Sequence, residues 1–472
     1  MMRACLDAVR HAELTRRTGR VLQINGLVIE ARGPQAALGE MCRLHAARGY
    51  QGNHRNPGDH GDPGDPGSHR NAGAHGAHDA SGHRDGLLAE VVAVTPERTI
   101  LLPYGGTEGL TTGCLVEAAG AAGDVAVGPA LLGRVIDGFG APLDGRPLPH
   151  LRERVPLRGA PQNPMTRPPV TAVLETGVRA IDTLLTLGQG QRIGIFAGSG
   201  VGKSSLLGMI ARHVRADVNV IALIGERSRE VRDFIDRHLG PEGLARSVVV
   251  VATADQPAPL RLRATHAALA IAGYFRGAGK QVLLTLDSAT RFAMARREVG
   301  LAAGEPPTAR GYTPSVFSEL PQLCERCGPA ASGGAITALF TVLVDGDDHD
   351  EPIADALRAS LDGHIVLSRE LAQRAHYPAI DILHSTSRLL SVLAKPPALQ
   401  QAHAARRLVA ELERNRAVID MGAYQRGNNA LLDAALAAEP ALRAFLAQRE
   451  CEGGVARAAA LEALAAIVKE VP

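Results

Sequence analysis

Five near-continuous runs of apolar residues dominate the middle of the chain. They read QRIGIFA, VNVIALIGE, SVVVVATA, QVLLTLD and AITALFTVLV, at 191–197, 218–226, 247–254, 281–287 and 335–344. Such runs, without polar alternation, are typical of strands buried on both faces, as in parallel sheets covered by helices. Stretches with helical spacing of apolar residues separate them. Between about residues 121 and 392 the pattern therefore predicts an α/β fold with a mainly parallel sheet.

Different patterns flank this core. Short strand-like segments at 20–32, 87–105 and 113–119, separated by turn residues, predict a small β-barrel over residues 1–120. After the sequence LAKPP, residues 393–472 become rich in Ala, Leu, Arg and Glu, which predicts a helical C-terminal domain.

An unusual segment, residues 51–86, interrupts the predicted barrel. It contains no Val, Ile, Leu, Met or aromatic residue, so it cannot bury a core and is expected to be a disordered surface insertion. Its six histidines suggest a transition-metal site as an alternative. We favour the inserted loop, because the entropic cost of closing a loop grows slowly with its length.

Composition and charge exclude several classes of protein. The 51 basic and 49 acidic residues give a net charge of +2, which lacks the basic excess of a dedicated nucleic-acid binder. No apolar run reaches the roughly 18 residues of a membrane span, and residues 1–17 have no apolar signal-peptide centre. We therefore expect a cytoplasmic protein.

Cys324 and Cys327 form a CxxC without a second pair, so we interpret them as reduced structural thiols.

The sequence AGSGVGKS at 197–204 matches a phosphate-binding P-loop except for its initial alanine. Its glycines allow backbone N–H groups to turn toward phosphates, and the following helix adds its positive end. Lys203 would reach the terminal phosphates, and the Ser204 hydroxyl would bind Mg²⁺. The predicted nucleotide-binding residues of this loop are Ala197, Gly198, Ser199, Gly200, Val201, Gly202, Lys203, Ser204 and Ser205.

Two acidic residues follow apolar runs and lie where the strands of an open sheet meet a ligand. Glu226 could orient or deprotonate the water that attacks the γ-phosphate, or it could simply cap the next helix. Asp287 ends the fourth run, the expected position of a Walker B magnesium partner. Tyr377 could stack on adenine and Arg388 could act across a subunit boundary, but the residues alone leave both roles open.

Taken together, these motifs resemble the type III secretion ATPases, relatives of the catalytic subunits of rotary ATP synthases. The resemblance covers nearly all of the chain outside residues 51–86. It rests on GQRIGIFAGSGVGKS, LIGERSREVRDFI, GEPPTARGYTPSVFSELPQL, GDDHDEPIADALRASLDGHIVLSRELA and HYPAIDILHSTSR. The family resemblance implies a RecA-like P-loop core, an N-terminal β-barrel and a C-terminal helical domain, assembled as a homohexamer with nucleotide between subunits.

The resemblance also assigns roles to individual residues. Lys203 and Ser204 match the contacts to phosphate and Mg²⁺, and Asp287 matches the Walker B acid. Further matches are a catalytic carboxylate, two site arginines, an adenine-stacking aromatic and an arginine finger donated by the neighbouring subunit, namely Glu226, Arg227, Arg291, Tyr377 and Arg388.

The same resemblance implies partners. The segment 309–317 matches the part that faces the central pore, where a stalk protein would sit. Stator proteins, the export gate and chaperone–effector complexes would be further partners, with peripheral association at the inner-membrane base of the secretion apparatus and no nucleic acid. The sequence departs from the family at four positions: Ser228 replaces a usual glycine, Thr313 a common proline, and Asn428 and Asn429 stand where an acid often occurs.

The leading hypothesis is therefore an ATPase that releases chaperones from export substrates and unfolds them, in an injectisome more than in a flagellum. A rotary ATP synthase subunit is the nearest alternative. A hexameric RNA helicase of the termination-factor type would need basic pore loops and stacking aromatics, but aromatics form only 3% of this chain. A protein that holds nucleotide without turnover is the third alternative.

Overall fold

The computed structural model describes residues 16–46, 86–120, 123–159, 162–344 and 351–469, and these form two compact units that divide after residue 122. The first unit is a closed antiparallel barrel with the strand order β1-β2-β5-β4-β3-β6. Its strands are β1 (Thr18–Asn25), β2 (Val28–Arg32), β3 (Met41–His45), β4 (Leu87–Val94), β5 (Thr99–Pro103) and β6 (Leu115–Gly120). The predicted barrel is confirmed, whereas almost all of the predicted insertion at 51–86 lies outside the described residues.

Alternation along the barrel strands explains why this segment closes on itself. Val21, Ile29, Leu44, Leu101 and Val116 point inward and form its core. Since successive side chains of a strand point to opposite faces, the intervening positions face outward. A closed barrel also leaves no unpaired strand edge.

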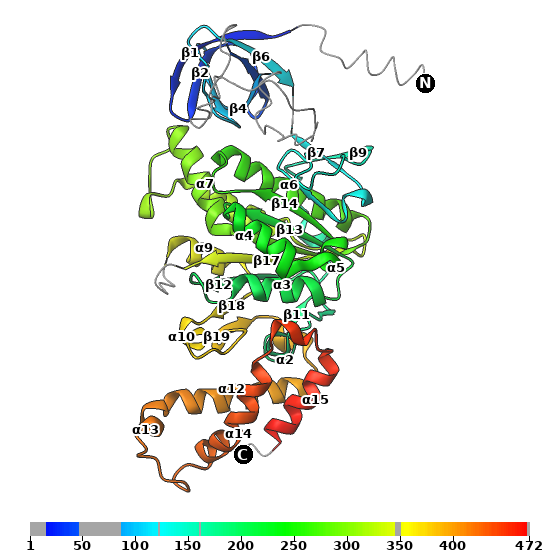
Figure 1. Cartoon of the computed structure of the whole chain (residues 1–472), viewed down its shortest axis with the longest axis vertical. Coiled ribbons are helices and arrows are strands. Elements are labelled where there is room, and N and C mark those ends of the chain that lie inside the picture. Colours follow the sequence, from blue (N-terminus) through cyan, green and yellow to red (C-terminus); the bar gives the residue numbers. More distant parts are fainter. Residues whose placement is uncertain (1–15, 47–85, 121–122, 160–161, 345–350, 470–472) are drawn as a thin grey trace, which may run out of the picture. The chain divides into compact units, whose positions relative to one another are not determined.

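A nine-stranded sheet forms the centre of the second unit (Figure 1). The strand order is β19-β18-β12-β17-β15-β13-β14-β8, with β16 paired to β17 at the side. Neighbours from β18 to β8 run parallel, and β19 runs antiparallel at the edge. The bounds are β8 (Arg134–Ile136), β12 (Arg192–Ala197), β13 (Val218–Ile224), β14 (Ser247–Ala252), β15 (Gln281–Asp287), β16 (Gly328–Pro329), β17 (Ala335–Leu343), β18 (Gly363–Leu367) and β19 (Ile380–Ser387).

All five apolar runs became strands of this sheet. Every residue of β13 and β14 is buried, as expected where helices cover both faces. The helices of this part are α2 (Arg179–Leu184), α3 (Lys203–His213), α4 (Ser228–Asp233), α5 (Gly240–Ala245), α6 (Ala258–Gly277), α7 (Ala289–Ala302), α8 (Pro314–Glu325), α9 (Pro352–Ser360) and α10 (Arg369–Gln373). Two short ribbons complete it, β7 (Asp124–Val127) with β9 (Glu153–Pro156) and β10 (Val173–Leu174) with β11 (Leu187–Gly188).

The C-terminal part is helical, as its composition predicted. It contains α11 (Leu390–Leu393), α12 (Pro396–Arg414), α13 (Arg416–Asp420), α14 (Ala430–Leu446) and α15 (Arg457–Val468), of which α12, α14 and α15 gather into one group (Figure 1). Ala405, Leu442 and Leu464 belong to the same hydrophobic cluster as Ile195 of the central sheet. These helices therefore pack within the second compact unit, and the predicted boundary at 392/393 stays a prediction. Within the described part of the chain, no helix is both long and apolar enough to cross a membrane.

Candidate nucleotide-hydrolysis site

The glycine-rich segment at 198–202 forms a loop between strand β12 and helix α3. Gly200 and Gly202 have φ angles of 78° and 92°, a region that L side chains rarely adopt, so glycine is required at both positions. The Val201 side chain is buried beneath the loop and anchors it. Helix α3 begins at Lys203, with Gly202 as its N-cap. This arrangement presents backbone N–H groups and the positive end of an 11-residue helix to the same point, which suits a phosphate.

Lys203 lies between the two carboxylates that the sequence singled out. Its ammonium group forms an ion pair with Asp287, and its Nζ lies 3.5 Å from Oε1 of Glu226. Strands β13 and β15 are adjacent and place Leu223 opposite Asp287, so both carboxylates emerge at the same edge of the sheet. Burial disfavours the charged ammonium, but the two carboxylates outweigh it and raise the pKa of Lys203. The structure therefore brings Lys203, Glu226 and Asp287 together.

Glu226 lies in a mostly buried position, with 15% of its side chain exposed. Burial raises its pKa from 4.5 to about 7; the Lys203 charge opposes this shift, and the nearby Asp287 and Glu230 add to it. A carboxylate whose pKa lies near neutrality can accept a proton and release it again at physiological pH. Glu226 is thus positioned beside the phosphate loop as a candidate general base.

Asp287 is held by a contact that the sequence did not predict. The hydroxyl of Thr341, on strand β17, donates a hydrogen bond of 2.7 Å to Oδ1 of Asp287. Both side chains are buried, so the bond fixes the carboxylate where it meets Lys203. The only signal in the sequence was a polar residue inside the run AITALFTVLV, which also fits an ordinary buried threonine.

Two of three further predicted residues border this cluster. The aliphatic stem of Arg291, in the first turn of α7, packs against Gly225, where an added Cβ would approach it to 2.8 Å. The Tyr377 ring lies beside the phosphate loop, since a Cβ on Gly202 would be 3.3 Å from it. Arg227 points into solvent, with 82% of its side chain exposed. Arg291 and Tyr377 thus border the site, whereas Arg227 does not contact the carboxylates of Glu226 and Asp287.

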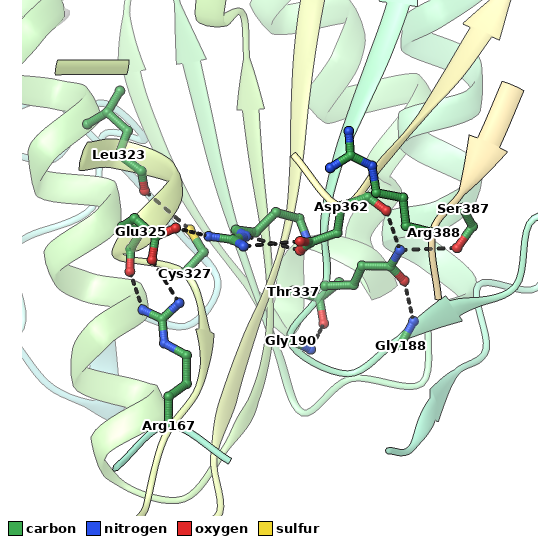
Figure 2. A network of polar contacts seen from close by, with 12 residues as sticks. Arg167, Gly188, Gly190, Leu323, Glu325, Cys327, Thr337, Asp362, Ser387 and Arg388 are labelled. Carbon is green, nitrogen blue, oxygen red and sulfur yellow. Dashed lines mark hydrogen bonds and ion pairs between the residues drawn. The ribbon is translucent and has the colours of Figure 1, made fainter. Parts of the chain in front are cut away.

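Arg388 lies elsewhere in the chain, directly after the edge strand β19. Its backbone N–H donates to the carbonyl oxygen of Asp362 at 3.0 Å. The Gln191 amide donates to the same carbonyl and to the Ser387 hydroxyl, both at 3.1 Å. The Asp362 carboxylate in turn accepts from Nε of Arg192 at 3.0 Å. Figure 2 shows the Arg388 side chain leaving this network of contacts.

This network lies at the end of the sheet where strand β12 begins, whereas the phosphate loop lies where β12 ends. Arg192 begins β12 and Ala197 ends it, and five strand steps of about 3.3 Å separate the two edges by roughly 17 Å. Arg388 is exposed and cannot reach Lys203 of its own chain without a large rearrangement. The structure therefore does not bring Arg388 into the cluster within one subunit.

The remaining predicted features have ordinary structural positions. Asn429 is the N-cap of α14, and its side chain accepts from the backbone N–H groups of Leu431 and Leu432. Cys324 and Cys327 are buried and not disulfide-bonded, and burial raises the pKa of both thiols, that of Cys327 to about 12. Thiols with pKa values this high are weak nucleophiles at neutral pH.

Comparisons with known proteins agree with this arrangement. Residues 177–387 match the nucleotide-binding domain of the ATP synthase alpha/beta family, and residues 394–466 match the T3SS EscN ATPase C-terminal domain. The flagellum-specific ATP synthase of Bacillus subtilis is 47% identical, over 94% of this chain and 93% of its own. The type 3 secretion system ATPase of Xanthomonas euvesicatoria is 45% identical, over 92% and 90%.

A solved structure extends the similarity to three dimensions. The assembled ATPase EscN from the enteropathogenic E. coli type III secretion system superposes with a TM-score of 0.83, at 40% identity, over 95% of this chain and all of that one. Because similarity at this level spans almost the whole chain, the protein belongs to the family of type III secretion and flagellum-specific ATPases, P-loop enzymes that hydrolyse ATP.

Proposed function

We propose that Lys203, Glu226 and Asp287 hydrolyse Mg²⁺-bound ATP, and that the hydrolysis powers protein export. The observation behind this proposal is the Lys203 ammonium between the two carboxylates, beside the phosphate loop. When ATP enters, its β- and γ-phosphates attract Lys203 away from the carboxylates. Glu226 is then free to orient the attacking water and to accept its proton.

Magnesium fits the donor atoms of this site. Mg²⁺ prefers hard oxygen ligands, and it neutralises charge that develops on the phosphates. The Ser204 hydroxyl in the first turn of α3 and the Asp287 carboxylate, fixed by Thr341, are the residues that would hold the ion directly or through water. The loop N–H groups and Lys203 hold the phosphates in place.

Arg388 completes the site of a neighbouring subunit in this proposal. It is exposed at the far edge of its own sheet and firmly held by its backbone, as an arginine donated across an interface would be. An arginine at that position stabilises the charge on the transferring phosphate. A closed homohexamer gives every nucleotide one such arginine, and the assembled state of EscN supports this arrangement.

The family supplies the purpose of the hydrolysis. Relatives at 42–50% identity are named for flagella and for type 3 secretion alike, so the identities do not separate the two branches. We propose that the ring acts at the cytoplasmic base of an export apparatus, where it releases chaperones from the export substrates and unfolds these substrates. EscN has been solved with its central stalk EscO, which supports a stalk protein as a partner of segment 309–317. The injectisome branch remains a prediction.

Replacing Glu226 tests the hydrolytic role. Glu226→Gln should abolish steady-state ATP turnover while ATP binding remains, because glutamine keeps the shape but cannot accept the proton. Turnover close to that of the wild type would remove Glu226 from the mechanism. Lys203→Ala is the matched control, since it should lose binding as well as turnover.

Co-purification from membranes tests the export role and its branch. Recovery of injectisome or flagellar components would support the export role and identify the branch. Recovery of ATP synthase components would contradict the export role. Stimulation of the ATPase by single-stranded RNA would favour a helicase instead.

A further inference from the structure

An arginine-lined cavity lies in the second compact unit, away from the phosphate loop. It measures about 780 Å³ and lies between the segment after β9 and helices α6 and α8. Its lining includes the end of α6, which precedes the start of β15, so it opens near the edge of the sheet where the parallel strands begin. The nucleotide site lies at the other edge. Five arginines line this cavity: Arg158, Arg167, Arg276, Arg296 and Arg326.

Only two of these arginines have a carboxylate partner. Arg167 pairs with Glu325 at 3.0 Å, and Nε of Arg296 lies 3.0 Å from Oε2 of Glu319. Those glutamates are the acidic residues of the lining. Among the residues that the structure describes, Arg158, Arg276 and Arg326 form no ion pair. Arg158 is exposed to solvent, whereas Arg276 and Arg326 are half-buried, so the cavity wall carries two partly buried arginines without a carboxylate partner.

Arg276 and Arg326 lie next to each other on the cavity wall. Nη1 of Arg276 donates to the backbone carbonyl of Arg326 at 2.8 Å, which fixes the position of Arg276. Nη1 of Arg326 lies 3.3 Å from Nδ1 of the buried His266, whose Nε2 lies 2.9 Å from Oε1 of Glu319. The two guanidinium groups are thus oriented by fixed neighbours. Nη1 of Arg276 also lies 3.4 Å from the Gly328 carbonyl oxygen, and within the described part of the chain no further protein acceptor contacts either group.

An anion would stabilise this pair of neighbouring guanidinium groups. Burial lowers the pKa of Arg276, and it lowers the pKa of Arg326 to about 10. Even so, both groups stay protonated at neutral pH. Both side chains are half-buried, and a charge that has lost part of its hydration is stabilised by a paired anion. Neighbouring arginines with free N–H groups match the geometry of a phosphate, which accepts several charge-assisted hydrogen bonds at once.

Part of the cavity lining is apolar. Leu269, Ala270, Tyr274 and Leu323 contribute to it, and the volume is far larger than one phosphate group needs. Cavities of this size bind small organic molecules, with a few polar groups that fix orientation. We propose that the cavity binds a small organic phosphate, with its phosphate on Arg276 and Arg326 and its organic part against Leu269 and Tyr274. This site is separate from the ATP site and does not depend on the proposed export function.

Pyrophosphate is a suitable probe for the phosphate position. Full-length protein saturated with Mg-ADP, so that the P-loop is filled, is titrated with pyrophosphate at constant ionic strength in a calorimeter. A binding event beyond the ADP site is expected. Arg276→Gln and Arg326→Gln should each weaken it by about tenfold or more, the loss of one charge-assisted contact. Arg326→Lys, which keeps the charge, should retain most of the affinity.

Matched controls separate this site from general effects of charge. Arg154→Gln removes an arginine of β9 that pairs with Asp124 outside the cavity, and it should leave pyrophosphate binding unchanged. All variants should bind Mg-ADP normally, which also shows that they are folded. Vesicles of phosphatidylglycerol form a second arm: binding that is lost in the same two variants would identify a lipid headgroup as the source of the phosphate. Absence of binding in both arms, or binding that survives both glutamine variants, would overturn the proposal.

Discussion

The substitution Glu226→Gln should make the nucleotide-free protein more stable at pH 8 while it abolishes turnover. The folded state raises the pKa of Glu226 from 4.5 to about 7, chiefly through burial. A group whose pKa is higher in the folded state than in the unfolded state stabilises the fold at pH values below its unfolded-state pKa. This stabilisation is lost as the pH rises through the folded-state pKa. The wild type therefore loses stability between about pH 4.5 and pH 7 at this residue. Glutamine imitates the protonated form at every pH, so the variant avoids that loss.

The magnitude follows from the difference between the two pKa values. At about 1.4 kcal/mol per pKa unit, a rise from 4.5 to about 7 corresponds to at most about 3.5 kcal/mol, and we expect roughly 3 kcal/mol at pH 8. At pH 5 the difference should fall to about 1 kcal/mol, because the folded wild type is then protonated at Glu226 and only the partial ionisation of the unfolded chain still separates the two proteins. For a unit of this size, about 3 kcal/mol corresponds to an increase of roughly 5 °C in melting temperature.

Thermal unfolding without nucleotide at pH 5 and pH 8, at one scan rate, measures this difference. Glu242→Gln is the control, because Glu242 is exposed on α5 and should give the same small effect at both pH values. If Glu226→Gln is no more stable than the wild type at pH 8, or equally stabilised at both pH values, the reasoning about its buried charge is refuted.

Three other substitutions test separate contacts. Thr341→Val removes the hydrogen bond to Asp287 and should lower kcat by about tenfold, with recovery in Thr341→Ser; unchanged kcat in the valine variant would exclude a positioning role. Asp362→Asn weakens the carboxylate contact that fixes Arg192 beside Arg388 but keeps the carbonyl that accepts from the Arg388 backbone. It should lower kcat without weakening ATP binding by dilute subunits, and adding Arg388→Ala should cause little further loss; additive losses would mean that Asp362 acts independently. Asn429→Ala removes a helix cap and should cost about 1 kcal/mol in denaturant unfolding with the KM for ATP unchanged, whereas a raised KM would place Asn429 at the nucleotide.

Much of the fold could be predicted because the decisive signals are local. A strand buried on both faces must be apolar throughout, so the five runs at 191–344 identified the sheet without any knowledge of its order. The phosphate loop was equally visible, since Gly200 and Gly202 adopt φ angles that the motif requires. Glu226 and Asp287 follow adjacent strands, and the common edge of parallel strands explains why they meet.

The missed features depend on contacts between distant segments. Thr341 is one polar residue in an apolar run, and only the pairing of β15 with β17 brings it to Asp287. The arginine-lined cavity is formed by residues between 155 and 326 that are distant in the sequence, and no sequence motif predicts it. The position of the C-terminal helices also depends on long-range contacts. Leu442 and Leu464 are buried against the core of the second unit and do not form a separate cluster.

Mixing two inactive variants tests the central claim that one subunit supplies Lys203, Glu226 and Asp287 while its neighbour supplies Arg388. Arg388→Ala subunits keep an intact phosphate loop, and Lys203→Ala subunits keep an intact arginine. Under conditions where the ring assembles, a one-to-one mixture should recover ATPase activity, because some interfaces then contain both residues. Verified mixed rings with no more activity than either variant alone would contradict the account.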